Sequence, residues 1–165
     1  MPSPEHDRLV LLAAKWLKRR NFGVVATELA TALTAEQPDA LGFRALSSAI
    51  VEVKVSRSDF LADAHKPWRQ GKPSLGLYRF YLCPEGLIPE TELPAGWGLL
   101  YESGGRVTEV VCPHGNMWPG ASAQPSHWTP FQHAVDSRAE QGALYSIARR
   151  LSAGKSVIKG MAPDK

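Results

Sequence analysis

The sequence predicts a mixed α/β domain in which a central sheet is covered by helices. Three observations support this class: helical spacing of apolar residues near both ends of the chain, short β-branched and aromatic runs between them, and proline or glycine at most boundaries. A length of 165 residues fits one domain, and 44% apolar with 21% charged residues is typical of a folded chain. We expect a single domain over residues 1–152 and a flexible tail over 153–165.

The first part of the chain predicts a helix and a β-hairpin. Apolar residues recur on one side of a helix within residues 4–20, and the charged residues lie elsewhere. The run VVATEL, residues 24–29, is too short for periodicity to decide between a strand and a helical turn. The stretch ALGFRALSSAIVEVKVS, residues 40–56, contains two strand-like runs joined by a brief turn, which predicts a hairpin.

The second part predicts a short helix, further strands and a final helix. Ser58 or Asp59 is expected to cap a helix that ends before Pro67. Strands are expected in LGLYRFYLCP and in WGLLYES, and the latter continues into a hairpin through two glycines. An amphipathic helix is expected over residues 131–151. Residues 112–130 are irregular, and we expect their tryptophans to fill the core or a loop.

Composition limits the classes of function. A net charge of +3 permits a polyanionic partner such as DNA without requiring one. The two cysteines, Cys83 and Cys112, imply no disulfide framework and favour a reducing compartment. The N-terminus lacks the layout of a secretion signal, and no apolar run approaches the roughly 18 residues of a membrane span. We therefore expect a cytoplasmic protein with no membrane partner.

The strand VEVKVS carries two charges on one face. Side chains alternate along a strand, so the valines share a core face while Glu52, Lys54 and Ser56 project from the other. Glu52 and Lys54 are then about 6 to 7 Å apart along the strand. One interpretation is a solvated face of an edge strand, where Glu and Lys are common. The other is a site, which depends on the residues nearby.

Asp39 favours the second interpretation. It stands at the start of the preceding strand, so a hairpin would bring its carboxylate beside Glu52. Two carboxylates beside a lysine suit Mg²⁺, which prefers oxygen ligands and also binds substrate phosphate. Asp39, Glu52 and the backbone carbonyl of Val53 would hold the ion, and a metal-bound water would attack the phosphodiester. Lys54 either orients that water or stabilises the transition state, and the sequence leaves both roles open.

These residues carry a resemblance to a known family. Pro38, Asp39, Glu52, Val53 and Lys54, written PD-x12-EVK, resemble the signature of the PD-(D/E)XK nuclease superfamily. The following SRSDFLAD is similar, more narrowly, to the putative DNA-repair endonucleases of the MmcB type, and the resemblance covers residues 5–101.

The resemblance implies a fold and roles for single residues. It implies a restriction-endonuclease-like core of αβββαβ order, metal ligation by Asp39 and Glu52, and a catalytic role for Lys54. Many members add an acidic residue from the first helix or the segment after it, and Glu28 in VVATELA matches that position. A solvated Glu near a helix end is the alternative for Glu28.

Basic and aromatic residues after the EVK strand are candidates for DNA contacts. A cluster of this composition suits phosphate contact and base stacking, although solvated surface charges are the alternative. Arg79 would reach the site if its strand lies next to the EVK strand, and Ser56 either touches substrate or caps the next helix. The candidates are Ser56, Arg57, Lys66, Trp68, Arg69, Lys72 and Arg79.

Together these observations predict a Mg²⁺- or Mn²⁺-dependent endonuclease acting on DNA, in DNA repair or in the processing of mobile-element or phage DNA. One rival is a nuclease-fold protein that binds nucleic acid or a partner without cutting, and another is a small interaction protein with no active site. A homodimer is possible if both strands are cut. The pair Cys112 and His114 would begin a zinc site only with a further histidine, and no second pair has a recognised spacing.

Overall fold

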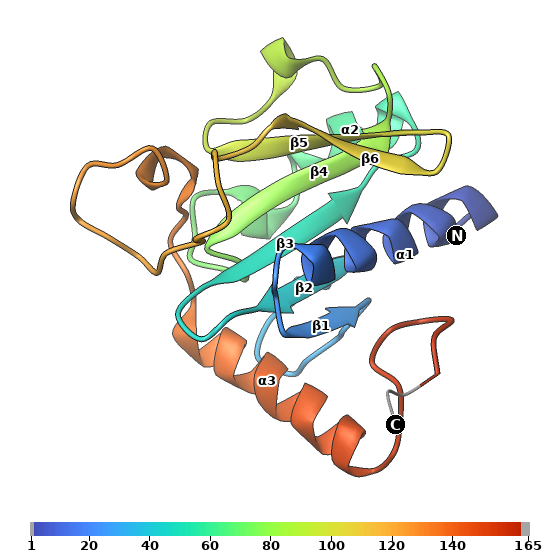
Figure 1. Cartoon of the computed structure of the whole chain (residues 1–165), viewed down its shortest axis with the longest axis vertical. Helices are drawn as coiled ribbons and strands as arrows, with labels where there is room; N and C mark the ends of the chain where they lie inside the picture. The colour runs from blue at the N-terminus through green and yellow to red at the C-terminus, as the bar shows by residue number, and fades with distance from the viewer. Residues whose placement is uncertain (1, 163–165) are drawn as a thin grey trace.

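The structure is a computed structural model that describes residues 2–162; residue 1 and residues 163–165, the end of the predicted tail, lie outside the described part. One six-stranded sheet runs through it in the order β1-β2-β3-β4-β5-β6 (Figure 1). The strands are β1 Val24–Thr27, β2 Ala40–Phe43, β3 Ser48–Val53, β4 Tyr78–Pro84, β5 Trp97–Ser103 and β6 Arg106–Val111. β3, β4 and β5 are parallel, and the remaining neighbours are antiparallel. The first four residues of the run VVATEL therefore form a strand at the edge of the sheet.

Helix α1, Pro4–Arg19, covers one face of the sheet (Figure 1). Ser3 accepts a hydrogen bond from the backbone N–H of His6 and so caps the helix. The buried side of α1, which includes Leu9 and Trp16, packs on the valines and aromatic residues of β3 and β4. This is the face on which the valines of VEVKV were expected. None of the helices within residues 2–162 combines the length and apolar character needed to cross a membrane.

Helices α2, Arg57–Asp63, and α3, Ser137–Ser152, pack against the opposite face. Ser56 caps α2, two or three residues before the residues expected to do so, because its hydroxyl accepts from the backbone N–H of Asp59. Asp136 caps α3, so the last helix begins later than the residue 131 expected from periodicity. Three short 3₁₀ helices, Pro67–Arg69, Glu90–Glu92 and Thr129–Phe131, lie in the connections.

The loop over residues 112–130 supplies the aromatic part of the core on the α1 face. Trp118 is 2% exposed and meets the rings of Tyr78 and Trp128 edge to face, with centroids 5.1 Å apart in each pair. Trp16 of α1 lies against the same cluster. The expectation that these tryptophans fill the core is confirmed.

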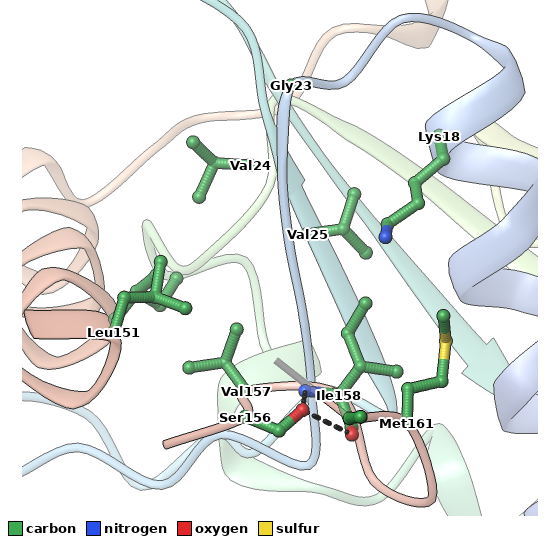
Figure 2. Close-up of a pocket in the computed structure, with 11 residues that line it drawn as sticks. Lys18, Gly23, Val24, Val25, Leu151, Ser156, Val157, Ile158 and Met161 are labelled. Carbon is green, nitrogen blue, oxygen red and sulfur yellow. Dashed lines mark hydrogen bonds between the residues drawn. The ribbon is translucent and has the colours of Figure 1, made fainter. Parts of the chain in front are cut away.

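The C-terminal segment corrects one expectation. The backbone N–H of Thr27 donates to the carbonyl of Val157, and the N–H of Lys159 donates to the hydroxyl of Thr27. Ile158 is buried, and an apolar pocket of about 100 Å³ lies where this segment meets α1, β1 and α3 (Figure 2). The predicted free tail is therefore wrong for residues 156–161, because they cover the exposed edge of β1.

Candidate active site

A cleft of about 420 Å³ opens where β1 and β3 end and β2 begins. Its polar lining comes from α1, from the ends of the three strands and from the region of α2. The lining includes His6, Glu28, Asp39, Glu52, Lys54 and Lys66. The cleft thus brings together all four residues that the sequence assigned to catalysis.

Strand register explains why Asp39 lies here. β2 and β3 are antiparallel, with Ala40 opposite Val51, so the residue before β2 meets the end of β3. The backbone N–H of Val53 donates to Oδ2 of Asp39 at 2.7 Å. The hairpin therefore places Asp39 against the EVK strand, as expected.

His6 and Glu28 complete the surroundings of Asp39. Nε2 of His6 is 3.3 Å from Oδ1 of Asp39, and this hydrogen bond raises the pKa of His6. Glu28 has a left-handed backbone with φ of 47°, and its N–H donates to the carbonyl of Asp39. One ligand atom from each of the three side chains lies within 4.8 Å of the others. This is the geometry on which a single divalent cation can be held.

Glu52 is buried on the α2 face of the sheet, with 4% of its surface exposed. Burial, together with the nearby charge of Asp39, raises the pKa of Glu52 to about 8 despite the opposing charges of Arg69 and Lys54. Oε1 of Glu52 is 3.1 Å from Nη2 of Arg69. At neutral pH its acid form therefore predominates unless a further cation approaches.

Lys54 is also buried, and its ammonium group is held by an anion from α2. Nζ of Lys54 donates to Oδ1 of Asp63 at 3.0 Å. Asp63 is fully buried; burial alone raises its pKa, but the charges of Arg69 and Lys54 lower that pKa well below its usual value. The two charges in VEVKV are thus not a solvated face.

Arg69 does not have the role that the sequence suggested. Its guanidinium pairs with Glu36 at 2.6 Å and Asp63 at 2.9 Å, and it lies 4.8 Å from the centroid of the Trp97 ring. Only 6% of its side chain is exposed, so it is not available for a DNA phosphate. The prediction of a DNA contact is wrong because the HKPWRQGK loop folds this arginine inward to neutralise buried carboxylates.

Arg79 also turns out to be internal. Its strand does lie beside β3, with Arg79 opposite Ile50. Its guanidinium donates to the carbonyls of Gly76 and Ala134, and the residue is 5% exposed. Burial lowers the pKa of Arg79. The predicted DNA contact is therefore corrected to a link between backbone segments.

Arg57 and Ser56 make local contacts. Arg57 pairs with Glu92 at 2.7 Å and donates to the carbonyl of Leu87. Arg57 is absent from the cleft lining, but 44% of its side chain is exposed, so its DNA contact stays a prediction. Ser56 caps α2, the second of the two roles left open for it.

Three candidates remain at or near the surface. Lys66 lines the cleft and pairs with Asp63 at 2.9 Å, with 37% of its side chain exposed. Trp68 is half-buried, with Nζ of Lys66 5.8 Å from its ring centroid. Lys72 is exposed. Among the predicted DNA contacts, only Lys66 lies in the cleft lining.

Sequence reasoning missed His6, Glu36 and Lys159, and it took Asp63 for a helix-surface residue, although Asp63 has no exposed surface. Nζ of Lys159 lies 3.4 Å from Oε2 of Glu28, although 131 positions separate the two in the chain numbering. No local sequence pattern predicts a contact between residues so far apart in the chain. Asp63, by contrast, belongs to the string DFLAD, which the sequence does single out. Within residues 2–162 the only close group of three metal-binding side chains is His6, Glu28 and Asp39, so the pair Cys112 and His114 does not gather a zinc site.

Comparison with known proteins gives a structural neighbour but no activity. No family model matches the chain, and no curated protein matches it. The chain is similar to the solved structure of the SPO1766 protein of unknown function from Silicibacter pomeroyi, with a TM-score of 0.54 and 26% identity over 86% of this chain and 87% of that one. The likeness supports the mixed α/β architecture with its six-stranded sheet flanked by helices.

Proposed function

We propose that the protein is a Mg²⁺- or Mn²⁺-dependent endonuclease that hydrolyses DNA phosphodiester bonds. The observation that carries the proposal is the convergence of Asp39, Glu52, Lys54 and Glu28 on one cleft at the end of the β2–β3 hairpin. Acidic side chains beside a buried lysine are the groups that metal-assisted phosphodiester hydrolysis needs.

The arrangement of elements supports the same proposal. An N-terminal helix, a three-stranded antiparallel unit, a short helix and a parallel fourth strand follow one another along the chain. This order is similar to the restriction-endonuclease-like core, and the EVK strand lies in the middle of it. A fold can carry many activities, so the proposal depends on the cleft residues and not on the fold alone.

The donor set fits a hard divalent cation. Asp39 and Glu28 offer carboxylate oxygens, and His6 offers a nitrogen that Mn²⁺ accepts more readily than Mg²⁺. Glu52 and the backbone carbonyl of Val53 line the same cleft and are the proposed further ligands, although Glu52 is not part of the close group of three. The ion would supply Lewis-acid stabilisation and a more acidic water. The protein holds Asp39 in place through Val53 N–H and His6.

Lys54 then acts on the phosphate or on the attacking water. Its ammonium group lies in the cleft lining, is buried, and pairs with Asp63. A cation fixed before substrate arrives stabilises charge that develops in the transition state at little reorganisation cost. Lys66 at the rim and exposed Lys72 nearby are the proposed contacts with the DNA backbone.

The test is a cleavage assay on a panel of DNAs. Purified protein is incubated with Mg²⁺ or Mn²⁺ and single-stranded, double-stranded, flapped or damaged DNA. We expect cleavage of at least one substrate, loss of that cleavage in Lys54→Ala, and wild-type cleavage in Lys15→Ala, a control on the exposed side of α1. Equal activity of folded Lys54→Ala and the wild type would falsify the mechanism.

The rival function is DNA binding without cleavage. It is favoured by one observation: Lys54 and Arg69 already neutralise the buried Asp63 in the absence of substrate. Gel-shift measurements on the same panel separate the two functions, because a pure binder retards DNA and leaves it intact. If both strands are cut, light scattering on the DNA complex tests the homodimer that such a cut favours.

A further inference from the structure

The string DFLAD ends in a carboxylate that the proposed mechanism does not use. Asp63 lies at the end of α2 and has no exposed surface. Nζ of Lys54 and of Lys66 lie 3.0 Å and 2.9 Å from Oδ1. Nε of Arg69 donates to Oδ2 at 2.9 Å, and the Tyr81 hydroxyl donates to the same oxygen at 2.6 Å. Four donors from three parts of the chain therefore meet on one buried carboxylate.

We propose that Asp63 is the positioning residue of the site: it holds the Lys54 ammonium group in the cleft and, through Arg69, fixes Glu52. This inference rests on the proposed function, because it takes Lys54 and Glu52 as the groups that act. Asp63 itself is absent from the cleft lining and does not touch substrate. It acts on the reaction only through its neighbours.

The physical reason lies in the burial of Lys54. A buried ammonium group is costly unless an anion and hydrogen-bond acceptors surround it. A lysine side chain also has four rotatable bonds, so a catalytic position needs a fixed partner. Asp63 meets both needs, since its Oδ1 accepts from Lys54 while Oδ2 is itself held by Tyr81 and Arg69.

The same string also anchors the helix that carries Asp63. Phe60 and Asp63 are three positions apart, so both project from one face of α2. The Phe60 ring meets the Tyr81 ring edge to face, with centroids 5.3 Å apart. Tyr81 lies opposite Glu52 in the parallel β3–β4 pair. The phenylalanine thus sets the helix against β4, and the aspartate then reaches Lys54.

The test uses Asp63→Asn in the full chain, with two readouts. The first is cleavage kinetics: we expect kcat to fall about 100-fold, the scale of a misplaced catalytic group, while KM for DNA is unchanged. The second is independent of activity: in protein with ¹⁵N-labelled lysine, the Lys54 ammonium resonance, assigned by its absence in Lys54→Met, is expected to disappear when its acceptor is lost. Asp136→Asn is the matched control, because asparagine caps α3 as well as aspartate does.

Each outcome decides the inference. A folded Asp63→Asn protein with wild-type kcat, or with the Lys54 resonance in place, would overturn it. If Asp63→Asn does not fold, Tyr81→Phe replaces it, since this variant keeps the ring stack on Trp97 and removes only one donor to Asp63. Tyr81→Phe should lower kcat by a smaller factor and broaden the Lys54 resonance; no change in either would contradict the inference. If the wild type cuts no DNA, the proposed function fails, while the resonance still shows whether Asp63 holds Lys54.

Discussion

Strand β4 buries aromatic rings on both of its faces, an apolar face toward α1 and a charged face toward α2. At its start, Tyr78 packs edge to face against Trp118 and Trp128, in a cluster made almost wholly of apolar groups. Three residues later, Tyr81 stacks on Trp97 at 4.3 Å and donates its hydroxyl to the buried carboxylate of Asp63. One strand therefore joins an apolar cluster to a charged one.

The difference separates a part of the fold that apolar packing stabilises from the part for which we propose chemistry. Apolar burial stabilises the fold directly, through area removed from water and close packing. Buried ion pairs such as Lys54–Asp63 and Arg69–Asp63 contribute little net stability, because desolvation offsets their attraction. A network of this kind beside a cleft is therefore a candidate functional feature.

The sharpest test of this comparison is Glu52→Gln. We expect cleavage to fall on the order of 1000-fold, because a metal ligand is lost. Stability should change little at neutral pH, because burial raises the pKa of Glu52 to about 8 and glutamine resembles the acid form. Cleavage assays measure the first quantity and urea unfolding the second, and Mn²⁺ titration calorimetry checks the loss of the metal ligand. The control is Glu85→Gln, at an exposed position after β4. If the Glu52→Gln protein cuts normally, Glu52 is not part of the active site.

The apolar face of β4 should behave in the opposite way. Trp118→Ala is expected to lower the free energy of unfolding by about 3–5 kcal/mol, because it opens a cavity among packed rings. Below its melting temperature, the folded variant should bind Mn²⁺ as the wild type does. Urea unfolding and calorimetry check both statements. The adjacent Met117 is 78% exposed, so Met117→Ala should cost less than about 0.5 kcal/mol; a comparable loss there would refute the packing argument.

The sequence predicted the mixed α/β class and the acidic part of the cleft because both depend on local patterns. Alternation along VEVKV identified the valine face, and hairpin geometry put Asp39 beside β3. The same patterns failed for Arg69, since whether a loop arginine faces water or turns inward depends on distant carboxylates. His6 was also missed, because its distance from Asp39 is set by how α1 packs on the sheet.

The stability contributed by the charged face of β4 should depend on pH, whereas that of the apolar face should not. The pKa of Glu52 is about 8 in the folded state, against 4.5 as the ordinary value, so the folded form retains a proton that the unfolded form loses. Without metal, stability should therefore fall as pH rises through this window. Glu52→Gln should abolish this part of the pH dependence.

The ionisation of Glu52 should also appear in the pH dependence of metal binding. Because the bound cation favours the carboxylate form, Mn²⁺ affinity should fall on the order of 10-fold per pH unit below the Glu52 pKa. Calorimetry in buffers of different ionisation enthalpy would show proton release on binding. Release that is unchanged in Glu52→Gln would assign the proton to another group.

The smallest expected effect concerns Lys66, at the rim of the cleft. Lys66 lines the cleft, whereas Arg57 is paired with Glu92 away from it. Lys66→Ala should reduce the slope of log K for DNA against log salt by about 0.9, the loss of one phosphate contact, while Arg57→Ala leaves the slope unchanged. Fluorescence anisotropy at several salt concentrations, with Ca²⁺ in place of Mg²⁺, measures the slopes. An equal change in both variants would mean that DNA also runs past α2 toward Glu92, and so is not confined to the cleft.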